Sequence, residues 1–246
     1  MIETRKLSKH FGTTVAVAGL DLRVQAGELV CLLGPNGAGK TTALRMLTGL
    51  LRPSGGKAWV GGFDIVEQPL AAKAVLGYVP DRPFLYERLT GRELLCFVGG
   101  LYRLNKSTLD QRAEMLLRAY DLDGCADMLI GAMSHGMRQK LSFAACFLHA
   151  PRVVIIDEPW VGLDPRSIRR IKDDLRARTH AGLAVLMSTH TLSIAEELAD
   201  RVGIVHRGRL LRVGTVAEIK ALATHPGSLE DIFLELTAET SDAVPP

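Results

Sequence analysis

The chain has 246 residues, of which 47% are hydrophobic and 23% are charged, a balance that is ordinary for one large soluble domain. Its formal net charge of +3 is too small to indicate a nucleic-acid partner. No apolar stretch approaches the roughly 18–20 residues of a membrane-spanning helix, and the N-terminus lacks the apolar core of a signal peptide. We therefore expect a cytoplasmic chain without a direct membrane span, with reduced, buried thiols at Cys31, Cys96, Cys125 and Cys146.

The first third of the chain is rich in short apolar segments. Leu20–Val24 and Leu29–Leu33 are predicted strands, because a turn signal at residues 25–28 separates them. Lys57–Val60 and Val75–Val79 have the same character. We expect an N-terminal antiparallel β region here.

Residues 34–42 have the sequence GPNGAGKTT, which matches the phosphate-loop pattern G-x-x-x-x-G-K-[ST]. The loop follows a predicted strand and precedes a helix-forming stretch at 43–47, which is the context that the pattern requires. Its glycines let backbone N–H groups turn toward phosphate oxygens, and the helix N-terminus adds partial positive charge. We predict that the nucleotide is bound by Gly34, Pro35, Asn36, Gly37, Ala38, Gly39, Lys40, Thr41 and Thr42. Lys40 would reach the β- and γ-phosphates of ATP, and the Thr41 hydroxyl would bind Mg²⁺.

The middle of the chain changes to helical spacing of its apolar residues. The predicted helices are Thr90–Tyr102, Ser107–Tyr120 and Ser134–Leu148. Thr90 and Glu93 fit a capping box at the start of the first of these helices. We therefore predict a helical subdomain at about 81–150, inserted in an α/β core.

The last third returns to alternating strands and helices. Its predicted buried strands are Val153–Ile156, Ala184–Met187 and Val202–Val205. Arg209–Val213 is a predicted edge strand, 228–236 a predicted helix and 238–246 a predicted disordered tail. The alternation predicts an α/β fold with a mostly parallel sheet, and residues 1–237 as a single domain.

Two adjacent carboxylates, Asp157 and Glu158, end the predicted strand at 153–156. Adjacent side chains at a strand end point in different directions, so one can face a metal and the other a water molecule. Asp157 would hold Mg²⁺, and Glu158 would act as the general base on the attacking water. A solvated strand end is the alternative, but an upstream phosphate loop needs an acidic metal partner.

Six motifs in order give the chain a close resemblance to the ATP-binding subunits of ABC transporters, over about residues 2–236. Beside the phosphate loop and 157–159, they are a Q-loop-like segment at 77–81, a signature-like segment at 134–139, a D-loop-like segment at 162–165 and a switch-like segment at 188–190. The resemblance implies a P-loop NTPase core, and an ATPase in which two subunits pair head to tail. Ser134 and Gly136 of one copy would then meet the γ-phosphate of ATP bound by the other.

The resemblance also implies roles for single residues. His190 would contact the γ-phosphate, and Asp164 would link the two sites across the dimer. Phe11 would stack on adenine, although an ordinary packing role for this phenylalanine remains open. The signature has His135 where the family usually has glycine, and Asp81 replaces the usual Q-loop glutamine. Asp81 is still expected to act in catalysis and to bind Mg²⁺ or its waters, although it cannot donate a hydrogen bond.

The resemblance implies a separate transmembrane permease and a homodimer or paired ATPase subunit as partners, and a place on the inner face of the cell membrane. The segments 82–90 and 228–234 resemble subunits that serve export systems. The aromatic run Pro83–Leu89 is predicted to receive the permease, unless it packs within the helical insertion. Two alternatives are a soluble ABC-type ATPase that acts on translation or chromosomes, and a regulatory module that binds nucleotide without hydrolysis.

Overall fold

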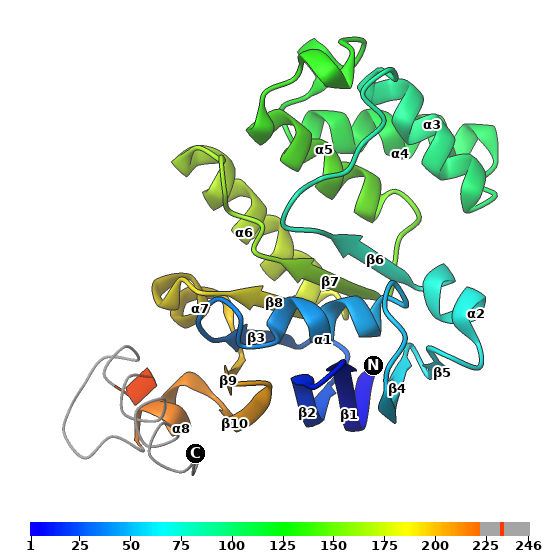
Figure 1. Ribbon diagram of the computed structural model, residues 1–246. Helices are drawn as coiled ribbons and strands as arrows, with labels where there is room; N and C mark the ends of the chain where they lie inside the picture. The colour runs from blue at the N-terminus through cyan, green and yellow to red at the C-terminus, as the bar shows by residue number, and fades with distance from the viewer. Residues whose placement is uncertain (222–231, 234–246) are drawn as a thin grey trace.

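A computed structural model describes residues 1–221 and 232–233 of the chain, which form two β-sheets with helices around the larger one (Figure 1). Most of the predicted helix at 228–236 and the whole predicted tail at 238–246 lie outside these residues. Within this described part, none of the helices combines the length and apolarity needed to cross a bilayer.

The larger sheet has the strand order β10-β9-β3-β8-β7-β6. Its strands run parallel to their neighbours, except that β10 pairs antiparallel with β9 at one edge. They are β3 (Leu29–Leu33), β6 (Leu76–Val79), β7 (Val153–Asp157), β8 (Ala184–Thr189), β9 (Arg201–His206) and β10 (Arg209–Gly214). The predicted parallel sheet and its edge strand are confirmed. Since parallel strands end at the same edge, the segments that follow β3, β7 and β8 meet there.

The smaller sheet is antiparallel and has the order β2-β1-β4-β5, which confirms the predicted N-terminal β region. Its strands are β1 (Ile2–Phe11), β2 (Thr14–Val24), β4 (Gly55–Val60) and β5 (Phe63–Asp64). The strand β1 has no counterpart among the predicted strands. Register shifts interrupt the pairing of β1 with β2 between Thr4 and His10, so this strand lacks the regular alternation that marks a strand in a sequence.

Three longer helices between β6 and β7 lie together beyond the edge of the larger sheet (Figure 1). They are α3 (Gly91–Leu101), α4 (Lys106–Ala119) and α5 (His135–Phe147), with short 3₁₀ turns η1 (Asp123–Cys125) and η2 (Ile130–Ala132). The predicted capping box is confirmed at α3, where Glu93 N–H donates to Thr90 Oγ1 at 3.1 Å and Thr90 N–H donates to Glu93 Oε2 at 2.8 Å. Such a cap stabilises a helix by about 1 kcal/mol.

The other helices pack around the sheets. They are α1 (Lys40–Leu47), α2 (Pro69–Ala74), α6 (Pro165–His180), α7 (Leu192–Leu198) and α8 (Val216–Lys220). The residues Ile232 and Phe233 are also helical.

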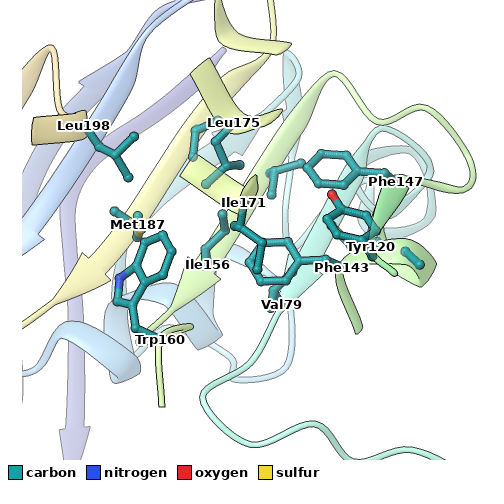
Figure 2. Close-up of a cluster of buried hydrophobic side chains, with 14 of the residues drawn as sticks. Val79, Tyr120, Phe143, Phe147, Ile156, Trp160, Ile171, Leu175, Met187 and Leu198 are labelled. Atoms are coloured by element: carbon teal, nitrogen blue, oxygen red, sulfur yellow. The ribbon is translucent and has the colours of Figure 1, made fainter. Parts of the chain in front are cut away.

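The core occupies both faces of the larger sheet. Val154 and Ile156 of β7 belong to one hydrophobic cluster, whereas Val153 and Ile155 belong to the other, because successive side chains of a strand alternate. Figure 2 shows the first cluster, where β6, β7 and β8 meet aromatic residues of α5 and aliphatic residues of α6. Phe143 is fully buried there, and burying such a side chain contributes about 1.5–3 kcal/mol. This packing holds the strand ends in fixed register.

The cysteine prediction is wrong for Cys96, which is exposed, and only partly right for Cys125, which is half-buried. Leu94 and Leu95 form the buried side of α3, so the next residue falls on its outer face. Cys31 and Cys146 are buried as predicted, and all four are free thiols. Burial raises the pKa of Cys146 to about 12.

Candidate functional site

The phosphate loop connects β3 to α1 and depends on a glycine at its last turn. Gly39 has φ 101°, and a Cβ added there would lie 2.3 Å from the carbonyl oxygen of Ala16. Both its left-handed backbone and this contact exclude a side chain. Gly39 therefore lets the strand β2 cover the loop closely at the point where the helix starts.

The Lys40 side chain lies inside the loop and is only 5% exposed. Its Nζ donates to Gly34 O at 2.6 Å and to Pro35 O at 3.2 Å, and it lies 3.7 Å from Glu158 Oε1. Burial lowers the pKa of Lys40, although the charges of Glu158 and Asp157 act in the opposite direction. The ammonium group is therefore held at the base of the loop, beside the carboxylates that end β7.

Asp157 lies at the end of β7 and is fully buried. Its Oδ1 accepts hydrogen bonds from Thr41 Oγ1 at 3.1 Å and from Ser188 Oγ at 2.5 Å. Burial raises the pKa of this carboxyl, whereas the two hydroxyl donors lower it. Within the described part of the chain, Oδ2 of Asp157 is buried and has no hydrogen-bond partner. One carboxylate oxygen is therefore fixed by the protein, and the hydrogen-bonding capacity of the other is unused.

Glu158 follows directly and is held in an unusual backbone conformation with φ 44°. A left-handed backbone at a residue with a side chain costs on the order of 1–3 kcal/mol and is concentrated at functional sites. His190 Nδ1–H donates to Glu158 Oε2 at 2.9 Å, and His190 N–H donates to the same oxygen at 3.3 Å. Glu158 thus lies between Lys40 and His190.

Lys40, Thr41, Glu158 and His190 share a cavity of about 390 Å³, whereas Asp157 lies behind Thr41 and does not line it. The residues that line it are Ala16, Pro35, Asn36, Gly37, Ala38, Gly39, Lys40, Thr41, Thr42, Asp81, Arg82, His135, Glu158, Val161 and His190. The structure therefore brings most of the predicted phosphate loop together with Asp81, Glu158 and His190. The charge of Asp81 also contributes to the raised pKa of Asp157.

The remaining predicted residues do not line this cavity. Ser134 is exposed and caps α5 by accepting a hydrogen bond from Met137 N–H at 3.2 Å, and Gly136 lies in the first turn of that helix. Asp164 is exposed and caps α6, where its Oδ1 accepts from Ser167 N–H at 2.9 Å. Hydrogen bonds from Ser167 lower the pKa of Asp164. Ser134, Gly136 and Asp164 therefore do not line the cavity, although His135, the first residue of α5, does.

His135 connects these two helix starts. Gly162 has φ 77°, and a Cβ added there would lie 2.4 Å from Cδ2 of His135. The imidazole therefore packs against the backbone of the loop that leads to α6. The histidine that replaces a glycine in the signature fits because residue 162 has no side chain.

Phe11, the predicted adenine platform, is half exposed at the end of β1. It does not line the cavity, and Lys9 Nζ lies 5.2 Å from its ring centroid. The prediction that Phe11 stacks on adenine stays a prediction.

A family model described as ABC transporter matches residues 17–161 of the chain. The chain belongs to the ABC transporter family. Daunorubicin/doxorubicin resistance ATP-binding protein DrrA of Streptomyces peucetius is 40% identical over 220 residues, which cover 89% of this chain and 67% of that protein. Linearmycin resistance ATP-binding protein LnrL of Bacillus subtilis (strain 168) is 34% identical over 219 residues, covering 89% and 70%.

Solved structures agree with this assignment. An ATP-binding subunit of an ABC transporter matches with a TM-score of 0.91 and 32% identity, covering 96% of this chain and 99% of that chain. A dimeric ATP-binding cassette in a post-hydrolysis state with ADP and phosphate matches with a TM-score of 0.80, covering 87% and 98%. At 22% identity, this second match supports the fold alone. The predicted family and fold class are confirmed, and the chain is an ATP-binding ABC ATPase.

Ala16, Arg82, Val161 and Ser188 belong to this ABC ATPase site but had no predicted role in it. Ala16 of β2 covers the phosphate loop, and Ser188 of β8 bonds Asp157. Ala16 has no pattern of its own, because the smaller sheet brings it against the loop, whereas Ser188 begins the switch-like segment and reaches Asp157 through the pairing of β7 with β8. The one available signal for Ser188 was its position two residues before His190, in a strand next to β7.

Proposed function

We propose that this ABC ATPase binds Mg-ATP between two copies arranged head to tail, and powers export through a permease made as a separate chain. The proposal rests on how the motifs are divided. Lys40, Glu158 and His190 share one cavity, whereas Ser134 and Asp164 lie outside it. A second copy, turned head to tail, would present its own Ser134 to the open side of that cavity and complete the phosphate site.

The donors around Asp157 fit Mg²⁺. Oδ2 of Asp157 is buried without a partner in the described part of the chain, and the Thr41 hydroxyl is 3.1 Å from Oδ1 of the same carboxylate. Mg²⁺ prefers oxygen ligands and keeps several waters when it also binds nucleotide phosphates, so one or two protein ligands suffice. Asp81 lines the same cavity and would bind the metal's waters. When bound, the ion would neutralise charge on the β- and γ-phosphates.

Glu158 is suited to be the general base. Its carboxylate lies at the edge of the phosphate loop, where it would accept a proton from the water that attacks the γ-phosphate. His190 holds this carboxylate at 2.9 Å and would contact the γ-phosphate from the same side. Lys40 would contribute charge stabilisation at the β- and γ-phosphates, and Phe11 would stack on adenine.

The two exposed helix starts would supply the interface of the pair. Backbone N–H groups near Ser134 and Gly136 would bind the γ-phosphate held by the partner subunit. Asp164 would connect the two sites, because it caps α6 next to the loop that His135 contacts. Closure would need ATP in both sites, and loss of the γ-phosphate would reopen the pair.

A groove of about 860 Å³ would receive the permease. Its apolar side is formed by Pro83, Phe84, Leu85, Val98, Leu101 and Tyr102, which we call the groove patch. The predicted aromatic run Pro83–Leu89 is partly exposed and partly packed. Phe84 and Tyr86 are 87% and 60% exposed, whereas Leu85 packs against the core. Docking on this patch would place the ATPase on the inner face of the cell membrane.

Export is supported by the relatives, two of which are named for resistance to daunorubicin/doxorubicin or to linearmycin. Export is therefore part of our proposal. We also propose that residues 1–237 form one functional domain, in which a helical subdomain is inserted at about 81–150.

Replacing Glu158 with glutamine tests the proposed site. We expect E158Q to bind ATP as the parent does, to lose at least about 100-fold in turnover, and to elute as an ATP-dependent dimer. Steady-state ATPase assays and size-exclusion chromatography with light scattering would measure these effects. Unchanged turnover would contradict the general-base role, and a monomer with ATP in both the parent and E158Q would contradict the paired site.

A further inference from the structure

Ser188 is a fully buried residue of β8 that lies beside Asp157 in the pairing of β7 with β8. Its place in the sheet is fixed on both sides, because β8 lies between β3 and β7. The residue lies two positions before His190, yet its side chain points toward β7 and bonds the carboxylate there.

The hydroxyl of Ser188 contacts both residues at the end of β7. It donates its proton to Asp157 Oδ1 at 2.5 Å, and it accepts a hydrogen bond from Glu158 N–H at 3.3 Å. The backbone carbonyl of Ser188 accepts from the same N–H at 3.2 Å. One residue therefore restrains the side chain of Asp157 and the backbone of Glu158.

The hydrogen bonds of Ser188 restrain the carboxylate of Asp157 and the backbone of Glu158, and both groups need a restraint. Thr41 and Ser188 both donate to Oδ1 of Asp157, so the carboxylate is oriented with Oδ2 free of protein partners in the described residues. Glu158 has a left-handed backbone at φ 44°, which persists only if its surroundings restrain it. The contact with Ser188 meets both needs at once.

We propose that Ser188 is a positioning residue of the hydrolysis site, whose hydroxyl orients Asp157 toward the metal and restrains Glu158 in the geometry of a base. This inference rests on the proposed roles of Asp157 and Glu158. Groups that orient a metal ligand typically contribute about 10–100-fold to metal affinity or activity. Ser188 would contact neither the nucleotide nor the metal.

The test compares S188A with S188T, which keeps a hydroxyl. Removal of the hydroxyl leaves Thr41 on Asp157 and the backbone acceptor on Glu158, so S188A should fold. T4V is the matched control, because Thr4 of the smaller sheet is another buried hydroxyl that donates one hydrogen bond and accepts one, both with backbone groups far from the site. Circular dichroism melts would monitor folding of each variant.

Three measurements separate positioning from general damage. Mn²⁺ affinity, measured by electron paramagnetic resonance with a non-hydrolysable ATP analogue, should fall about 10–100-fold in S188A. Nucleotide affinity in EDTA and the KM for ATP should change less than about twofold, while kcat falls by a similar 10–100-fold factor. S188T should recover most of both losses, and T4V should match the parent.

The outcomes distinguish this inference from the proposed function. D157N should abolish Mn²⁺ binding by the protein. If D157N still bound Mn²⁺ as the parent does, the metal role of Asp157 would be wrong, and the inference would be wrong with it. If D157N loses this binding while a folded S188A keeps the parent's Mn²⁺ affinity and kcat, the role of Ser188 is wrong. A folded S188T with losses equal to those of S188A would also overturn it.

Discussion

At the scale of single residues, the site depends on a few buried charges that contact one another. Lys40 Nζ lies 3.7 Å from Glu158 Oε1, and the Ser188 hydroxyl links Asp157 to the backbone of Glu158. Burial disfavours the charged forms of Lys40 and Asp157. Burial lowers the pKa of Lys40, whereas the charges of Glu158 and Asp157 raise it. Two loop carbonyls also accept hydrogen bonds from its ammonium group. The same buried charge would bind phosphate strongly.

Removing this charge should weaken nucleotide binding. We expect K40A to lose about 10–100-fold in ATP affinity, because a hydrogen bond to a charged group contributes about 1.5–3 kcal/mol. Fluorescence titration with a nucleotide analogue would measure the change. K57A is the matched control, since Lys57 is an exposed lysine that pairs with Glu67 on the surface. Parent-like ATP affinity in K40A would rule out the phosphate-loop assignment.

At the scale of elements, the helices α3 and α5 are joined to β6 by a histidine. The ring of His149 stacks on that of Tyr102, which ends α3, with centroids 3.7 Å apart and an interplanar angle of 11°. His149 Nε2 also lies 3.1 Å from Leu76 O of β6. A neutral imidazole thus connects the helices to the sheet directly beside the groove patch.

This joint should make stability depend on pH. Burial lowers the pKa of His149 to about 4, against about 6.5 in an unfolded chain. Between these values the unfolded chain takes up a proton that the folded chain does not, so stability is complete above pH 6.5 and falls as pH drops toward 4. We expect H149Q to show a shallower decrease of melting temperature over this range.

The control for this measurement is H180Q, which replaces an exposed histidine at the end of α6. Thermal melts of the parent and the two variants at a series of pH values would give the slopes. Equal slopes in the parent and H149Q would show that His149 does not cause the pH dependence.

A second contact between elements shows how the signature-like segment accommodates a histidine where the family usually has glycine. His135 at the start of α5 packs on Gly162, in the loop between β7 and α6. The signature-like and D-loop-like segments therefore contact each other within one chain, and a movement of one would be passed to the other. Of these two segments, only the signature-like one lines the cavity of the phosphate loop, through His135, and Val161 lines it directly before the D-loop-like segment.

At the scale of the whole molecule, the nucleotide cavity and the proposed permease groove lie on different parts of the fold. The phosphate loop and Glu158 occupy the edge where the parallel strands end, whereas the groove patch lies between β6 and the helices α3 and α5. Asp81 lines both cavities, because it follows β6 directly. If the groove receives a permease as proposed, a residue shared by both cavities would link nucleotide state to that contact.

The groove patch predicts a membrane partner. A tagged chain should capture an integral membrane protein from detergent-solubilised membranes of its source organism, and F84D should lower the recovery at least about tenfold. M115D is the control, because Met115 is an exposed apolar residue of α4 that does not line the groove. Quantitative mass spectrometry would measure recovery. Capture of ribosomal or DNA-bound proteins instead would favour the soluble alternative.

The sequence by itself determined the family, the fold class and most of the residues that line the cavity. The phosphate loop, Asp157-Glu158 and the capping box of α3 are encoded by neighbouring residues, so local pattern is sufficient to identify them. The alternation of strands and helices likewise predicted the parallel sheet, because strands buried on both faces are continuously apolar.

Only the tertiary structure decided which groups meet across the chain. The pairing of β7 with β8 brings Ser188 to Asp157, and the close passage of β2 brings Ala16 to Gly39. The same packing exposes Cys96 and separates Ser134 from the chain's own phosphate loop. These contacts depend on strand register and on how the core fills, so residues distant in the sequence set them, and no local pattern contains that information.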